Sequence, residues 1–204
     1  MSELKVNKIS PVSASGTTQL GDSGDTFTIP SGCTFTNSGT ATGFGSAAKC
    51  GQVVQAHKSD VSSFTSQNVI YNIPGLAVTI TPAAASSKIL ILGTLNSNAT
   101  TVDGVMQVTR NVASGGATSI GASTAGVGQA GISGLGGHRN GYELMTAGTT
   151  YLDTPTYTLG QSIVYQMGIL RAGTTVFYIN RDTSNTGSAG EHTSSQIIAI
   201  EILA

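Results

Sequence analysis

The chain has 204 residues, enough for one or two domains, and only 9% of them are charged, with a net charge of −1 at pH 7. It contains no long run of like charges and no apolar run near the roughly 18 residues that span a bilayer, so we expect neither nucleic acid nor membrane insertion. Because charges are few, 24 Ser, 28 Thr and 27 Gly must supply much of the surface polarity. The N-terminus also lacks the apolar core of a secretory signal.

The first 45 residues differ in composition from the rest. Gly24–Thr28 (GDTFT) and Gly32–Thr36 (GCTFT) are two copies of one unit, and Phe27 and Phe35 are among the few large apolar side chains there. Repeats that cannot bury an apolar face alone must stack on something, and the same segment of sister chains is the simplest partner. We therefore predict a β segment at 1–45 that associates with the same segment of sister chains, a boundary near residue 46, and Phe27 and Phe35 in the contact between chains.

Residues 46–204 show a succession of short apolar segments bounded by turn residues. The apolar residues alternate with period two or form short runs, and no stretch of ten or more has the period of a helix. This pattern predicts an all-β domain, a two-sheet sandwich of jelly-roll type. The expected strands are Gln52–Lys58, Gln67–Ile73, Ala77–Thr81, Lys88–Asn96, Val105–Asn111, Ile163–Leu170, Thr175–Arg181 and Gln196–Leu203.

Two of these strands are apolar on both faces, although one face of an antiparallel sandwich is normally polar. An identical subunit is the most economical cover for the second face, and a long loop folded over it is the alternative. Glu201 is the only charge in the last strand; we expect it at an open edge, or near the subunit interface and paired with Lys88 or Arg110, because an unpaired buried charge is costly. The predicted interface residues are Ile89, Ile91, Ile198, Ile200 and Glu201.

Two glycine-rich or polar segments interrupt the strands. Residues 113–141 carry so few large side chains that we expect a long exposed loop outside the core, which could be shortened at little cost, and 182–192 is a shorter loop of this kind. Long ordered loops tend to carry function. The side chains in and beside these loops that offer hydrogen bonds to a partner are Arg139, Asn140, Tyr142, Asn185 and His192.

No catalytic or metal-binding pattern is present. Gly126–Gly131 (GVGQAG) matches the dinucleotide-binding expression but lacks the preceding strand and following helix that the chemistry requires. Cys33 and Cys50 have a spacing that fits no zinc site, and the three histidines are scattered. We expect no enzyme activity, no metal and no cofactor, and two unpaired cysteines, with a disulfide between them as the alternative.

Several phrases nevertheless resemble a known family. The N-terminal segments are Met1–Ile9, Gly24–Gly32 and Thr36–Gly45; the later ones are Ile80–Pro82, Ser86–Ile91, Tyr151–Pro155, Ile179–Arg181 and Ile197–Glu201. The N-terminal segments resemble tail-fibre-like virion proteins of marine bacteriophages, cyanophages above all, and the later segments resemble the C-terminal domain of the same proteins. Residues 113–141 are the least recognisable part, and the chain is short for a fibre, with no extended shaft.

The resemblance implies a homotrimeric fibre or spike on a phage particle, assembled in the host cytoplasm. The segment 1–45 would trimerise and attach to other virion proteins. Residues 46–204 would form a head similar to the trimeric C1q and TNF heads that contacts a host glycan or protein. The candidate receptor-contact residues are then Arg139, Asn140, Tyr142, Asn185 and His192. The alternative is a capsid or tail cement or adaptor protein that binds only virion proteins. A polysaccharide-cleaving spike would need a pair of carboxylates on one strand face, which the sequence lacks.

Overall fold

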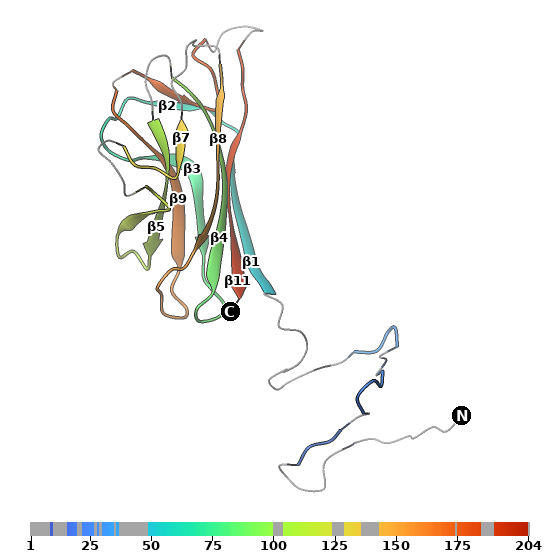
Figure 1. Cartoon of the computed structure of the whole chain (residues 1–204). Helices are drawn as coiled ribbons and strands as arrows, with labels where there is room; N and C mark the ends of the chain where they lie inside the picture. Colours follow the sequence, from blue (N-terminus) through green and yellow to red (C-terminus); the bar gives the residue numbers. More distant parts are fainter. Residues whose placement is uncertain are drawn as a thin grey trace. The chain divides into compact units, whose positions relative to one another are not determined.

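The chain divides into two compact units, Met1–Ser46 and Ala47–Ala204. The computed structural model describes residues 9, 16–19, 22–26, 28, 30–34, 36, 49–99, 104–123, 129–135, 143–173, 175–184 and 190–203. The named strands all lie in the second unit, which we call the head (Figure 1).

In the first unit the two copies of the repeat each begin with a tight turn. The N–H of Asp25 donates to the carbonyl of Asp22 at 3.1 Å, and the N–H of Cys33 donates to that of Pro30 at 3.2 Å. The third residue of each turn is a glycine with positive φ, +98° at Gly24 and +86° at Gly32. A positive φ at this position defines a type II turn, which explains why glycine recurs every eight residues.

The head is a sandwich of two antiparallel sheets, so the prediction of an all-β, jelly-roll-type fold is confirmed (Figure 1). What we call the β4 sheet has the order β1-β11-β4-β10-β2, with β8 paired to the other side of β4. The β5 sheet has the order β3-β9-β5-β6, and β7 also pairs with β5. The strands are β1 Lys49–Lys58, β2 Ser62–Phe64, β3 Tyr71–Ile80, β4 Lys88–Asn98, β5 Gly104–Val112, β6 Ala117–Ile120, β7 Ser133–Leu135, β8 Met145–Asp153, β9 Ile163–Arg171, β10 Phe177–Ile179 and β11 Ser195–Leu203.

The core lies between the sheets and takes alternate residues from each strand. On β4 the inward residues include Ile89 and Ile91, which are fully buried within the single chain. On β11 the inward residues include Ile197 and Ala199, also fully buried. The prediction that Ile89 and Ile91 lie in a subunit interface is therefore wrong, because they point into the core of their own head.

The glycine-rich segment is not the free loop that the sequence suggested. Within its described parts, β6 and β7 both pair with β5, and Ile120 and Leu135 are buried in the core. At Gly131 an added Cβ would lie 2.5 Å from the Cβ of Val105, so glycine permits the close approach of this segment to β5. The described parts of 113–141 thus belong to the β5 sheet and its core.

Candidate interaction surface

The outward side of the β4 sheet carries a row of aliphatic residues. In the strand register Val53 of β1 lies beside Ile200 of β11, Ile200 beside Leu90 of β4, and Leu90 beside Leu152 of β8. Their sequence neighbours on these strands point into the core, so this row faces away from it. Val53 is 59% exposed and Leu152 is 48% exposed, while Leu90 and Ile200 are half-buried.

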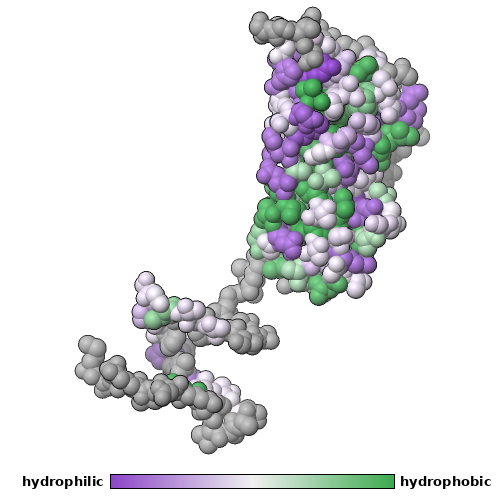
Figure 2. Space-filling model, turned by 180° about the vertical axis from the view of Figure 1, so that it is seen from behind, coloured by the Kyte–Doolittle hydropathy of each residue, from purple (hydrophilic) through white to green (hydrophobic). Residues whose placement is uncertain are grey.

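Two further rows lie beside the first in the same register, and we call the three rows together the outward face. The second row consists of Gln55, Ile198, Leu92 and Thr150, and the third of His57, Gln196, Thr94 and Gly148. No position in the three rows is occupied by Asp, Glu, Lys or Arg. The face therefore changes from aliphatic to polar along the strands. Figure 2 shows the head from the back of the Figure 1 view, where hydrophobic residues are more frequent in the half that holds the end of β11.

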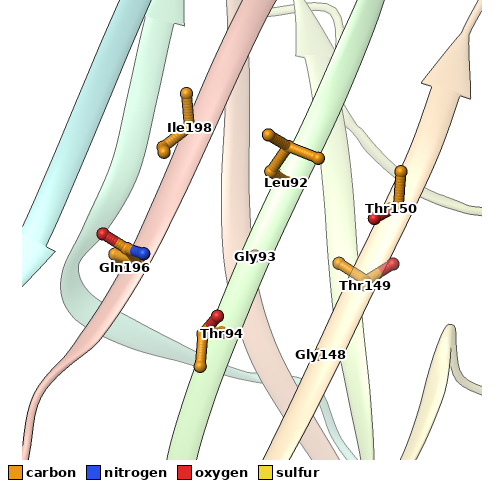
Figure 3. Close-up of a pocket in the computed structure, with 8 residues that line it drawn as sticks. All are labelled: Leu92, Gly93, Thr94, Gly148, Thr149, Thr150, Gln196 and Ile198. Carbon is orange, nitrogen blue, oxygen red and sulfur yellow. The ribbon is translucent and has the colours of Figure 1, made fainter.

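A hollow of about 370 Å³ lies on this face, across β11, β4 and β8 (Figure 3). Its lining combines the aliphatic side chains of Leu92 and Ile198 with the polar groups of Thr94, Thr149, Thr150 and Gln196, together with Gly93 and Gly148. At Gly148 an added Cβ would meet no atom closer than the Gly93 carbonyl oxygen, at 3.8 Å. The hollow is open at this edge because residue 148 has no side chain.

Glu201 lies inside the head. Contrary to our prediction, its carboxylate is paired with neither Lys88 nor Arg110. Its Oε1 accepts hydrogen bonds from the N–H of Ala83 at 2.7 Å and the hydroxyl of Ser87 at 2.8 Å, and its Oε2 accepts one from the N–H of Gln52 at 3.4 Å. Burial raises the pKa of this carboxyl, but these hydrogen bonds together outweigh burial and hold the pKa below its ordinary value. A Cβ at Gly51 would lie 2.6 Å from Oε2, so glycine there makes room for the carboxylate.

Arg110, one of the two expected partners of Glu201, binds Asp153 instead. Its Nη1 lies 2.8 Å from one carboxylate oxygen of Asp153 and 3.0 Å from the other. The hydroxyl of Tyr165 donates to the same carboxylate at 2.7 Å. Burial, followed by this hydrogen bond, raises the pKa of Tyr165, which keeps its hydroxyl a donor. The three residues link β5, β8 and β9 inside the sandwich.

Of the predicted receptor-contact residues, only His192 lies in the described part of the chain. It is exposed and forms an isolated β-bridge with Arg181. The Arg181 guanidinium lies 4.1 Å from the centroid of the Tyr178 ring, a cation–π contact. This group lies at the start of β11, the opposite end of the strand from the C-terminus (Figure 1). Arg139, Asn140, Tyr142 and Asn185 lie outside the described residues, as do the predicted interface residues Phe27 and Phe35.

Ile198 and Ile200, two of the predicted interface residues, lie on the outward face, but the sequence analysis missed their neighbours there. Leu90 and Leu92, rather than Ile89 and Ile91, accompany them on the outward face. The register of β4 against β11 decides this, since Ile198 lies beside Leu92. Leu152 was missed because β8 was not recognised as a strand, although its side chains alternate between the two faces.

Within the described ranges no group of three His, Cys, Asp or Glu side chains could hold a metal ion. Cys33 and Cys50 are both exposed and unbonded. A search of the same residues also finds no helix with the length and apolar character needed to cross a membrane.

The fold and the outward face define a class of protein, an all-β sandwich of jelly-roll type with an aliphatic row on one outer side. No protein-family model matches the chain, and no curated protein matches it. Among solved structures it is similar to a chain in the structure of infectious bursal disease virus, Gx strain, with a TM-score of 0.37 and 14% sequence identity. The match covers 75% of this chain and 37% of that one, and a likeness at this level carries no argument about function. The resemblance to phage tail-fibre-like proteins stays a prediction.

Proposed function

We propose that the chain is a non-enzymatic structural protein of a virus particle, one subunit of a homotrimeric fibre or spike whose heads associate through the outward face. The observation that carries this proposal is the row formed by Val53, Ile200, Leu90 and Leu152. Contiguous exposed apolar surface marks interaction sites, and charged residues are depleted at the centre of interfaces. A solvent-facing sheet would normally carry polar residues at these positions.

A ring of subunits whose strands run in the same direction suits this face better than a two-fold pair with antiparallel strands. When strands of all subunits run in the same direction, each row meets the same row of the next subunit, so the aliphatic row meets aliphatic residues and polar rows meet polar residues. An antiparallel arrangement that overlaps the whole face would put the aliphatic row against the row of His57 and Gln196. The contact joins the β8 edge of one head to the β1 edge of the next, a heterologous contact that closes into a ring. The number three comes from the resemblance to fibre proteins.

The same proposal assigns host contact to the end of the head that carries His192, Arg181 and Tyr178. The Arg181 side chain is held against the Tyr178 ring and is partly exposed, and its several N–H donors suit hydrogen bonds to a glycan or protein surface. Three copies on one trimer multiply weak contacts into useful avidity. The N-terminal unit would then attach the head to other virion proteins.

Light scattering of the purified full-length chain tests the assembly. A trimer has a mass of about 62 kDa, three times the 20.6 kDa of one chain. A monodisperse monomer at micromolar concentration would refute the proposal.

Electron microscopy of the particle, with an antibody against the head, tests the position. Heads that point into solvent support host contact, whereas heads buried among capsid or tail proteins would overturn it in favour of a cement or adaptor protein.

A further inference from the structure

The third row of the outward face carries complementary features at its two ends. His57 pairs with Gln196, Gln196 with Thr94, and Thr94 with Gly148, so all four lie at the same level across the sheet. One end of the row is an exposed imidazole on the edge strand β1. The other end is the hollow beside Gly148 on the edge strand β8.

The geometry points to an insertion of His57 of one head into the hollow beside Gly148 of the next, three times around the trimer. This inference rests on the proposed trimer and adds which residues of neighbouring heads meet. In a cyclic assembly with strands along the axis, the β1 edge of each head meets the β8 edge of its neighbour at equal height. A projecting side chain at one edge and a missing one at the other are then brought together by symmetry.

The chemistry of the row supports His57 as the occupant. The other long polar side chains nearby, Gln55 and Gln196, are hydrogen-bonded to each other at 2.9 Å within one head. The His57 side chain makes no hydrogen bond or ion pair with the described residues, so its two ring nitrogens are available, while its backbone pairs with Gln196 in the sheet. The hollow offers the hydroxyls of Thr94 and Thr150 to these nitrogens, while Leu92 and Ile198 provide an apolar wall for the ring (Figure 3).

The first test fills the hollow in the full-length chain. Gly148→Val adds a side chain whose Cβ meets no close contact within its own head, because the nearest atom lies 3.8 Å away. Blocking three holes in one trimer should raise the concentration at which trimers dissociate by about a hundredfold or more. Gly134→Val on β7 is the matched control, since an added Cβ there meets nothing within 4 Å and the residue lies on the other sheet. The control should assemble like the wild type, and both variants should show an unchanged far-ultraviolet circular dichroism spectrum.

A second substitution identifies the side chain that enters the hollow. In the Gly148→Val background, His57→Ala vacates the space that the new valine occupies and should restore most of the lost association. His57→Ala alone should weaken assembly by about tenfold. Sedimentation equilibrium measures all four combinations. If the wild type is a trimer and His57→Ala gives no relief, the inference is wrong while the proposed function stands; a monomeric wild type refutes both.

A cross-link gives a readout that does not depend on packing. Within one head His57 and Gly148 lie three strand spacings apart, about 14 Å, too far for a disulfide. With Cys33→Ser and Cys50→Ser as background, the double variant His57→Cys and Gly148→Cys should therefore form disulfides only between heads. We expect covalent dimers and trimers after mild oxidation. Exclusively single chains from an assembled trimer would overturn the inference.

Discussion

Replacement of Leu152 by glutamine tests the outward face most directly. Leu152 is 48% exposed in the single head, so the proposed trimer would bury about half of its side chain. Full burial of a leucine side chain contributes about 1.5–3 kcal/mol, and half of that is about 1 kcal/mol for each head. Three heads together lose about 3 kcal/mol, which corresponds to roughly a hundredfold lower association constant for the trimer.

The chain offers a matched control in Leu159. It is 59% exposed but lies in the connection between β8 and β9, away from the outward face. Sedimentation equilibrium of Leu152→Gln, Leu159→Gln and the wild type compares the three directly. We expect a shift only for Leu152→Gln, with the thermal unfolding of the isolated head unchanged. Equal behaviour of the two variants would show that the face is not the contact surface.

Three further predictions concern the head itself, each measured by denaturant unfolding. Glu201→Gln should lower the free energy of unfolding by about 1–3 kcal/mol at pH 7. Because folding lowers the pKa of this carboxyl, the difference in stability from the wild type should shrink as the pH falls below the ordinary pKa of 4.5. A difference that stays constant with pH would contradict this prediction. Leu135→Ala should lower the free energy of unfolding by about 2–5 kcal/mol, since Leu135 is 2% exposed. A loss under about 0.5 kcal/mol would indicate that the glycine-rich segment is a free loop after all. Asp153→Asn should cost about 3 kcal/mol by removing the charged partner of Arg110, whose side chain is 25% exposed, whereas an unchanged midpoint would show that the ion pair contributes nothing.

The strands that the sequence predicted well are those with dense β-branched or aliphatic residues. The long central strands β4, β5, β9 and β11 were all expected within two residues of their observed ends. The pattern failed for β8, whose threonines and glycine alternate with few large apolar residues. It also failed for β6 and β7, which are only four and three residues long and gain their stability from pairing with β5. Stability that comes from pairing with another strand leaves little trace in local composition.

A bulge explains another difference. The sequence suggested separate strands at Gln67–Ile73 and Ala77–Thr81, but β3 runs through from Tyr71 to Ile80. Its register against β9 shifts between Asn72 and Ala77, where Gly75 has a φ of +84°. Proline and glycine in this stretch indicated a break, whereas they mark an irregularity within a continuous strand.

The choice of face in the last strand could not be read from polarity alone. A one-residue shift in register exchanges the two faces of a strand, and the usual rule would turn Glu201 outward and bury Ile198 and Ile200. The head does the reverse, because Ser87, Ala83 and Gln52 supply the carboxylate with hydrogen bonds at the inner side. These donors come from the connection before β4 and from the start of β1, segments far from β11 in the sequence.

The buried carboxylate and the aliphatic outer row are therefore two consequences of one choice. With Glu201 inward, the alternation of β11 turns Ile198 and Ile200 outward, beside Leu92 and Leu90. The hydrogen bonds to Glu201 offset the desolvation of its charge, so the head can adopt the register that places this carboxylate inward. Among the described residues nothing covers Val53 or Leu152 further, and they stay 59% and 48% exposed. The arrangement that satisfies a single charge inside the head is thus the one that leaves an apolar surface on its outer side.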